Sequence, residues 1–230
     1  MAQRIKNDYD MDKVLETLIV DEIGDSHLMT SIDTPLREDA FEKSDEEKIH
    51  CIARYFKGIM EELGLDLTDD SIQGTPYRVA KMYLKEIFHG LDPKNKPKIS
   101  IFDNKYEYHK MLVEKDISVV SFCEHHFMPI VGKAHVAYVP KDHVIGLSKI
   151  NRIVTYYCRR PQVQERLTLQ IYRELTAVLG TDAVMVVVEA EHMCVSARGV
   201  QDVQSKTITM EYGGIFLEKE RRDEFLTLIG

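Results

Sequence analysis

The sequence has 230 residues, of which 44% are hydrophobic, and its formal net charge is −8 at pH 7. A chain of this length can bury one substantial core, so the composition excludes a protein that is disordered throughout. The negative charge argues against broad binding to nucleic acid or to an anionic membrane, although it permits a local basic pocket. No stretch resembles a transmembrane helix or a signal peptide. We therefore expect a cytoplasmic protein whose four cysteines are reduced unless they bind a metal.

The first 43 residues predict a partly ordered N-terminal arm. They are polar, they contain a break at Thr34-Pro35, and only residues 11–19 show a short amphipathic pattern. Such an arm can mediate contacts, respond to an effector or have no role, and the sequence does not choose among these.

Residues 44–97 predict a helical N-terminal region. Ser44 and Glu47 have the spacing of a capping box, which opens a helix that Gly64 can end. A second helix is expected to begin at Thr75-Pro76, with Thr75 as the N-cap, and to run to Gly90.

Residues 98–230 alternate between strand-like and helical patterns. Helices are expected to begin near Ser148 and at Pro161, the second ending before Gly180, and a terminal helix is expected over 218–228. The β-prone runs are 117–122, 134–139, 183–190 and 206–212. These patterns predict an α+β fold in which helices are segregated from an antiparallel sheet.

Two short clusters of cysteine and histidine suit a metal such as zinc. In the first, Cys123 and His126 have a spacing that lets one turn present both side chains to one ion, whereas His125 is spare and available for proton transfer. In the second, His192 and Cys194 can face the same side of a strand end. Four ligands would make a closed structural site, and three would leave a catalytic site open. Spacing alone does not choose between them, and the simplest alternative is that the thiols are buried core groups.

A basic stretch follows the first cluster and has two possible interpretations, a solvated helix face or an anion site. Its cationic residues are Lys149, Arg152, Arg159, Arg160 and Arg166. No Walker-type loop is present, so a phosphate ligand would have to be bound by side chains.

Four segments resemble the signature segments of GTP cyclohydrolase I. They are residues 123–127, 146–154, 160–168 and 192–199, and the resemblance extends from 75–82 to 213–216. It covers more than half of the chain in order, but not the N-terminal arm. The family converts GTP and water to 7,8-dihydroneopterin triphosphate and formate, so the resemblance implies GTP as the substrate and a place at the first step of pterin and folate biosynthesis.

The resemblance implies that Cys123, His126 and Cys194 bind Zn2+ and that the site is catalytic. Zinc would then activate the water that attacks C8 of the purine. His192, a possible ligand by spacing, becomes the acid that protonates the purine nitrogen, and His125 serves a later proton transfer.

The resemblance also implies a nucleotide pocket. Glu165, with Gln164 beside it, would accept the N1–H and N2–H donors of guanine, although both residues could instead cap or solvate the first turn of a helix. Ser148 would lie near the ribose, and its alternative role is an N-cap. The implied phosphate ligands are Lys149, Arg152, Arg198 and Arg78. Arg159, Arg160 and Arg166 are expected to be structural or exposed to solvent.

For the architecture, the resemblance implies a tunnelling fold over residues 98–230, with an antiparallel four-stranded sheet that carries helices on one side. Subunits would close their sheets into a barrel, as a decamer with active sites between copies. Two rival hypotheses are another tunnelling-fold pterin or deazapurine enzyme, and a zinc-stabilised purine- or pterin-binding protein without cyclohydrolase activity. The second rival uses all four cysteine and histidine donors as structural ligands.

Overall fold

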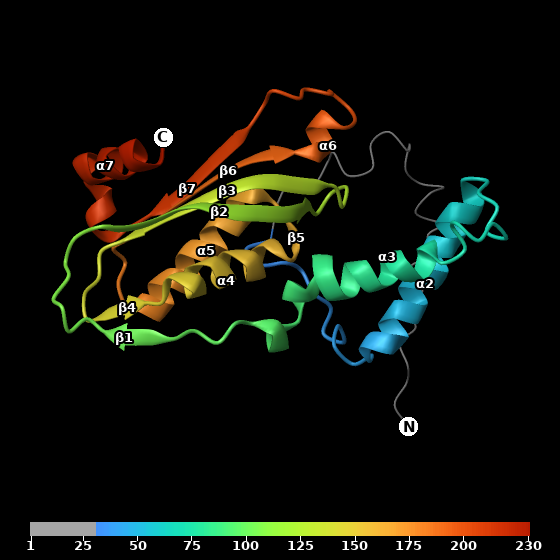
Figure 1. The fold of residues 1–230 in the computed structure, drawn as a ribbon, viewed down its shortest axis with the longest axis horizontal. Coiled ribbons are helices and arrows are strands. Elements are labelled where there is room, and N and C mark those ends of the chain that lie inside the picture. The colour runs from blue at the N-terminus through green and yellow to red at the C-terminus, as the bar shows by residue number, and fades with distance from the viewer. Residues whose placement is uncertain (1–30) are drawn as a thin grey trace. The chain divides into compact units, whose positions relative to one another are not determined.

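The computed structural model describes residues 31–230, and residues Asp33–Gly230 form one compact unit (Figure 1). The amphipathic stretch expected at 11–19, and most of the predicted arm, lie outside the described residues. The division of the chain at residues 43 and 97 stays a prediction. None of the helices in the described part is both long enough and apolar enough to cross a membrane.

Helix α2 (Asp45–Glu62) begins with the predicted capping box. The Ser44 hydroxyl accepts a hydrogen bond from the Glu47 N–H at 3.3 Å, and the Glu47 carboxylate accepts one from the Ser44 N–H at 2.8 Å. Two of the helix's free N–H groups are thereby satisfied, which explains why this boundary was readable from local sequence.

The second helical segment is less regular than expected. Helix α3 (Thr75–Met82) has Gly74 rather than Thr75 as its N-cap. It continues not as α-helix but as the π-helical segment η2 (Tyr83–Ile87), followed by two 3-10 turns, η3 (His89–Leu91) and η4 (Pro93–Asn95). The expectation of one continuous helix to Gly90 was therefore wrong.

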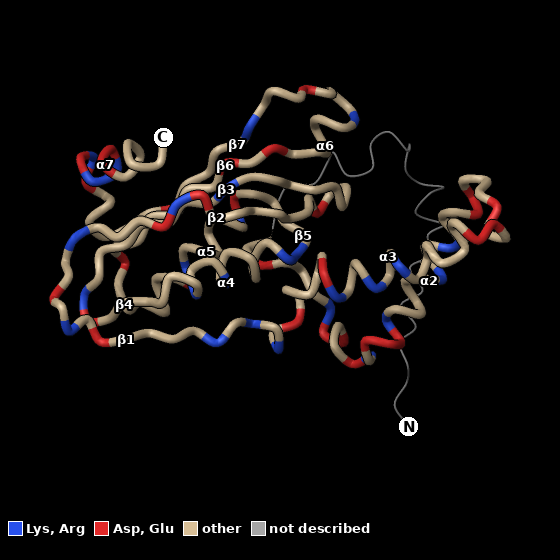
Figure 2. Tube along the Cα trace, viewed as in Figure 1, with Lys and Arg blue, Asp and Glu red and all other residues tan. Residues whose placement is uncertain are grey.

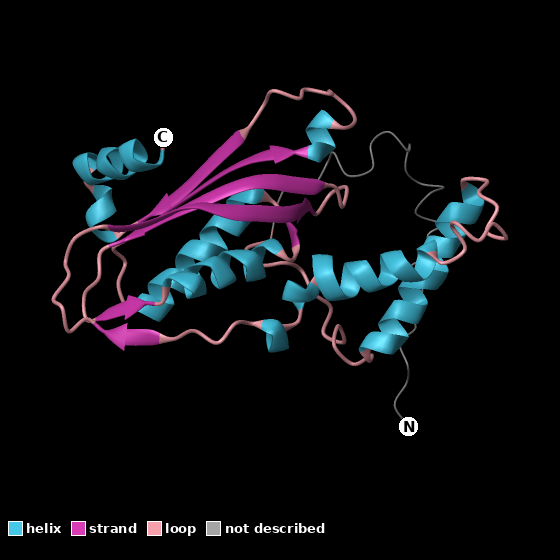
Figure 3. Cartoon of the chain, viewed as in Figure 1, coloured by secondary structure: helices cyan, strands magenta, loops and turns pink. Residues whose placement is uncertain are grey.

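The main sheet has the strand order β5-β2-β3-β6-β7 (Figure 3). Strands β2 (Leu112–Cys123), β3 (Pro129–Tyr138), β6 (Val184–His192) and β7 (Thr207–Tyr212) pair antiparallel, as expected. The fifth strand, β5 (Pro161–Gln162), pairs parallel with the end of β2, so the expected sheet of four strands was incomplete. A separate small sheet joins β1 (Ile101–Asp103) to β4 (His143–Ile145).

Strand β5 occupies the place where a helix was expected to begin. The Gln162 carbonyl accepts a hydrogen bond from the Glu124 N–H at 3.0 Å, and the Gln162 side chain is fully buried. These tertiary contacts hold Pro161 and Gln162 extended, so helix α5 (Gln164–Leu179) begins later, after the N-cap Val163. Pairing with β2 overrides the local preference of proline for the first turn of a helix.

Helices lie on both faces of the main sheet, not on one side as expected (Figure 1). Helix α4 (Leu147–Cys158) and α5 share the larger core with inward side chains such as Val186 and Val188. On the opposite face, Met185 and Val187 pack with Phe216 of the 3-10 segment η5 (Gly214–Leu217) and Phe225 of α7 (Lys219–Ile229). Alternate residues of β6 are thus buried on both faces, which explains its uninterrupted apolar run.

Helix α7 buries Phe225 and carries charged residues of both signs in its first half, residues 219–224 (Figure 2). It covers only the end of the sheet where Tyr138 pairs with Leu112 and Val184, which we call the Tyr138 end.

The opposite end of the sheet, which we call the Cys123 end, brings the two cysteine and histidine clusters together. Phe122 of β2 pairs with Pro129 of β3, and Ile130 of β3 pairs with His192 of β6. Because β3 lies between its two antiparallel neighbours, the last residues of β2 and β6 meet at one edge of the fold. The short helix α6 (Met193–Ser196) follows β6 there.

Candidate metal and nucleotide site

The first cluster lies in the tight turn between β2 and β3, which we call the metal turn (residues 123–128). The Cys123 N–H donates to the Met128 carbonyl, and the Phe127 N–H donates to the Cys123 carbonyl, both at 2.8 Å. Phe127 closes the turn in the left-handed region, at φ 53°. The Cys123 sulfur consequently lies 3.7 Å from Nδ1 of His125 and 4.0 Å from Nδ1 of His126.

Three donors converge at this turn. Ligand atoms of Cys123, His126 and Cys194 all lie within 4.8 Å of one another, and His192 does not belong to this group. Burial and the neighbouring Cys123 raise the pKa of the Cys194 thiol, because two thiolates so close would repel each other. A cation between the sulfurs would reverse that effect, and a Cys2His donor set suits zinc. The residues present therefore fit a metal ion with three protein ligands.

Arg198 touches the same group of donors. Its Nη1 lies 2.9 Å from Nε2 of His126. Arginine can only donate, so Nε2 accepts and Nδ1 carries the proton of a neutral ring. If His126 bound a metal ion through Nδ1, Nε2 would carry the hydrogen and could not accept one from Arg198.

His192, the last residue of β6, is held by α5. Its Nε2 lies 2.7 Å from Oε1 of Gln164, and burial lowers its pKa while the nearby Glu165 carboxylate opposes that shift. Glu165 itself is exposed at the first turn of α5. The lowered pKa of His192 favours its neutral imidazole, which lies near the exposed carboxylate of Glu165.

Glu124 was not predicted as a site residue, yet it joins the metal turn to α5. One carboxylate oxygen contacts Nη2 of Arg166, and the other lies 3.8 Å from Nε2 of His125. The Arg166 side chain is only 3% exposed and also donates to Oε1 of Gln162 at 3.0 Å. Arg166 is therefore structural and not solvent-facing. The signal that could have found Glu124 is its position, a charged residue inside a cysteine and histidine cluster.

Comparison with known proteins identifies the family of this chain. The family model of GTP cyclohydrolase I matches residues 52–230. The chain belongs to the GTP cyclohydrolase I family.

Curated members of the GTP cyclohydrolase I family match most of the chain. GTP cyclohydrolase 1 of Flavobacterium johnsoniae is 58% identical over 210 residues, which cover 91% of this chain and 94% of that protein. The enzyme of Salmonella gallinarum is 49% identical over 208 residues, covering 90% and 94%. Similarity at this level over nearly the whole length identifies the chain as an enzyme of this family. A solved structure of the archaeosine synthase QueF-Like in the apo form has a TM-score of only 0.38 at 17% identity, covering 46% of this chain and 95% of that one.

Three residues that the resemblance to GTP cyclohydrolase I assigns to the nucleotide lie elsewhere in the same chain. Ser148, Lys149 and Arg152 occupy the first half of α4, whose N-cap is Gly146. Just before α4, the Ile145 N–H donates to the Tyr138 hydroxyl at 3.4 Å, so this half of the helix belongs to the Tyr138 end. The ten strand residues between the two ends span roughly 33 Å. The structure therefore does not bring these residues to the metal turn of their own chain.

Arg78, the remaining expected phosphate ligand, lies on α3. It donates to the Thr75 hydroxyl at 2.8 Å and to the Ser71 carbonyl at 3.3 Å. Within the described residues, no hydrogen bond or ion pair connects it to the metal turn.

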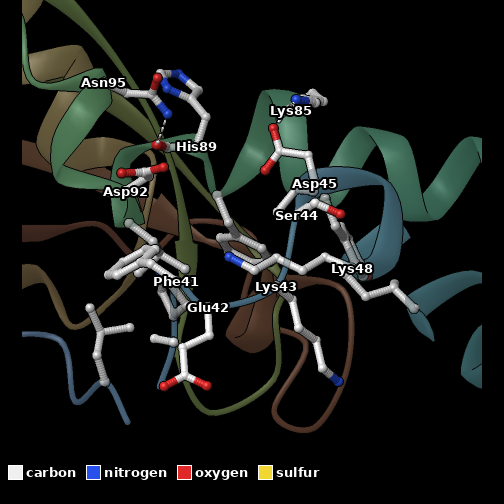
Figure 4. A pocket seen from close by; sticks show the side chains of 18 of the residues that line it. Phe41, Glu42, Lys43, Ser44, Asp45, Lys48, Lys85, His89, Asp92 and Asn95 are labelled. Atoms are coloured by element: carbon white, nitrogen blue, oxygen red, sulfur yellow. Dashed lines mark hydrogen bonds and ion pairs between the residues drawn. The ribbon is translucent and has the colours of Figure 1, made fainter. Parts of the chain in front are cut away.

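A cavity of about 1230 Å3 lies beside the metal turn, between α2 and the segments η2 to η4 (Figure 4). Polar side chains including Asp45, Lys48 and Asp92 line it together with aromatic rings. Phe127 also lines it, and its ring centroid lies 5.1 Å from that of Phe88. Because Phe127 follows His126 directly, the cavity and the candidate metal donors share one turn of backbone.

Proposed function

We propose that this protein converts GTP and water to 7,8-dihydroneopterin triphosphate and formate, with zinc bound by Cys123, His126 and Cys194. The main support for the proposal is that ligand atoms of Cys123, His126 and Cys194 all lie within 4.8 Å of one another, whereas His192 is not part of this group. A closed structural site would use His192 as a fourth ligand, so this geometry favours an open site over a purely structural one. When bound, zinc would act as a Lewis acid and lower the pKa of a water molecule.

The two remaining histidines supply proton transfer. His192 is held by Gln164 and is favoured as neutral by burial, so it can take up a proton and deliver it to the purine nitrogen that becomes an amine. His125 lies beside both Cys123 and Glu124, and we assign it the later proton transfer during rearrangement of the ribose.

Guanine recognition is assigned to Glu165. Its carboxylate is exposed at the start of α5 and close enough to His192 to influence its pKa. One carboxylate can accept from both N1–H and N2–H of guanine, a pair of donors that adenine lacks on that edge. We assign Ser148 to the ribose. The proposed phosphate ligands are Lys149, Arg152, Arg198 and Arg78.

These assignments require more than one copy of the chain, because Lys149 and Arg152 lie at the Tyr138 end. We propose a tunnelling-fold homo-oligomer, a decamer as the resemblance implies, in which the α4 residues of one copy complete the Cys123 end of another. The exposed apolar side chains Ile208 and Met210 on β7, which are 58% and 42% exposed, support burial of this strand between copies.

The test is an assay of zinc-loaded protein with GTP for formate and dihydroneopterin triphosphate. Cys123→Ser should lose turnover and bound zinc, whereas Cys51→Ser on α2 should retain both. A zinc-stabilised binding protein would instead unfold on chelation and release no formate. Cleavage of GTP to GDP and phosphate, or full turnover by Cys123→Ser, would contradict the proposal.

Guanine recognition is tested separately with Glu165→Gln. Loss of a charge-assisted pair of hydrogen bonds should lower kcat/KM for GTP about 10- to 100-fold, because such bonds contribute about 1.5–3 kcal/mol. Zinc content and thermal stability should be unchanged, since Glu165 is exposed and outside the group of metal donors. Unchanged GTP turnover would remove Glu165 from the guanine pocket.

A further inference from the structure

The side chain of Gln164 is buried, with only 1% of the residue exposed, at the first position of α5. Its Nε2 lies 3.0 Å from the Val188 carbonyl oxygen, 2.9 Å from the Thr207 carbonyl oxygen and 3.2 Å from the Thr209 hydroxyl. On the other side, its Oε1 lies 2.7 Å from Nε2 of His192. The amide therefore bridges β6, β7 and the histidine.

These partners fix which way the amide points. Carbonyl oxygens only accept hydrogen bonds, so the NH2 group must face Val188 and Thr207. A flipped amide would set its oxygen about 3 Å from two carbonyl oxygens, with no hydrogen between them to form a bond. The Thr168 hydroxyl donates to the backbone carbonyl of Gln164 at 2.9 Å and lies 2.6 Å from the Thr209 hydroxyl. The Thr209 hydroxyl therefore donates to Thr168, which leaves its oxygen free to accept from the NH2 group of Gln164.

The orientation of the amide determines the tautomer of His192. An amide oxygen has no hydrogen to give, so the short contact requires a hydrogen on Nε2 of the imidazole. This requirement holds for the neutral ring and for the imidazolium alike. The only ring nitrogen whose proton can come and go without breaking the contact is Nδ1.

We propose that Gln164 is a positioning residue that holds His192 as its Nε2–H tautomer, so that proton exchange with the substrate occurs at Nδ1. In the step assigned to His192, the Nδ1–H bond of the imidazolium breaks and the proton passes to the purine nitrogen, which leaves the neutral Nε2–H ring. The role at Nδ1 rests on the proposed function, whereas the tautomer does not. Gln164 acts through His192, and its NH2 group is already engaged by two backbone carbonyls, so it is not available to donate to guanine.

The direct test is solid-state NMR of sedimented, zinc-loaded protein carrying 15N-labelled histidine. The His192 resonances, assigned by their loss in His192→Asn, should show a protonated Nε2 in the absence of GTP. A wild-type Nε2 without hydrogen would overturn the inference even if the enzyme turns over. A protonated Nε2 together with no formate release would overturn the proposed function and leave the tautomer assignment standing.

A pair of variants separates positioning from substrate binding. Gln164→Leu should lose the uniform Nε2–H signature and lower kcat on the order of tenfold or more, with little change in KM for GTP. Gln170→Leu is the matched control, because Gln170 is also a buried glutamine of α5, 4% exposed, and its amide contacts Gln162 and Asp33 rather than His192. A raised KM with unchanged kcat and tautomer in Gln164→Leu would show that Gln164 binds substrate instead.

Discussion

The guanidinium of Arg166 is buried next to the metal turn, and its charge is balanced by Glu124. A buried ion pair contributes little net stability compared with apolar residues of the same shape, but removal of one partner leaves an uncompensated charge. The pair also links α5, which carries Glu165, to the turn that carries His125. The ion pair therefore couples the positions of two segments that carry residues with proposed roles in the reaction.

We therefore expect Arg166→Met to lower the free energy of unfolding by about 3 kcal/mol, because the Glu124 carboxylate is left without its charged partner. Adding Glu124→Gln should recover part of that loss, as measured by urea denaturation of the zinc-loaded protein. The control is Arg221→Met, since Arg221 and Glu224 form a surface pair in which both side chains are 47% exposed, and its effect should stay within about 0.5 kcal/mol. No recovery in the double variant would argue against the pair as the cause.

The cysteines outside the metal group differ in how buried they are. Complete burial raises the pKa of the Cys158 thiol to about 12, whereas Cys51 is only partly buried on α2. The thiolate is the reactive form, so Cys158 stays protonated as the pH rises through 8 and 9.

Alkylation by iodoacetamide at pH 8, followed by mass spectrometry, should modify Cys51 first and Cys158 only in denaturant. Cys123 and Cys194 should react faster after zinc is removed by a chelator, because coordination occupies both thiolates. Equal rates for these two thiols with and without chelator would contradict their place in the metal group. Native labelling of Cys158 as fast as that of Cys51 would contradict its burial.

At the scale of secondary-structure elements, two glycines occupy opposite environments. A Cβ added to Gly132 in β3 would lie 2.0 Å from the Glu189 carbonyl oxygen and 2.5 Å from Cα of Ala190, both in β6. A Cβ added to Gly58 in α2 would meet nothing within 4 Å. The first glycine permits close approach of two strands, whereas the second weakens a helix.

Gly132→Ala should therefore destabilise the fold by about 3 kcal/mol or more, since backbone atoms of β6 cannot move aside cheaply. Gly58→Ala should stabilise it by about 0.5–1 kcal/mol through helix propensity. Thermal or urea unfolding of each zinc-loaded variant, compared with the unsubstituted protein, measures these two changes in the free energy of unfolding. Similar effects of the two substitutions would show that the strand spacing does not depend on Gly132.

Local sequence signals predicted those elements whose causes are local. The capping box at Ser44 and the β-prone runs of the four antiparallel strands were readable because the local residue types determine them. The start at Pro161 was misread because pairing with β2, a tertiary contact, holds that segment extended. For the site, the resemblance predicted the three candidate metal donors that lie together, whereas residue spacing alone also admitted His192. Neither predicted the contact of Glu124 with Arg166, because nothing in the spacing shows that a turn and a helix 42 residues apart meet.

At the scale of the whole molecule, the expected site residues are divided between the two ends of the sheet. The metal donors and both site histidines lie at the Cys123 end, while Ser148, Lys149 and Arg152 lie at the Tyr138 end. One chain cannot fold these ends together, because the strands between them are rigid and roughly 33 Å long. If the proposed roles are right, complete sites exist only between copies.

This division predicts complementation between inactive variants. Cys123→Ser and Lys149→Ala chains should each have little turnover as pure oligomers. Co-expressed in equal amounts, they should form mixed oligomers in which about a quarter of the sites pair an intact Cys123 end with an intact α4, so turnover should return to about a quarter of wild type. The control mixes Cys123→Ser with Cys194→Ser chains. Every chain then has one defect at its own Cys123 end, so no mixed site is complete. Light scattering checks that all samples have the same oligomeric state. No recovery in the test pair despite mixed oligomers would place Lys149 and the metal group in a single-chain site or remove Lys149 from the site. Recovery in the control would show that Cys123 and Cys194 of one chain do not act at the same site.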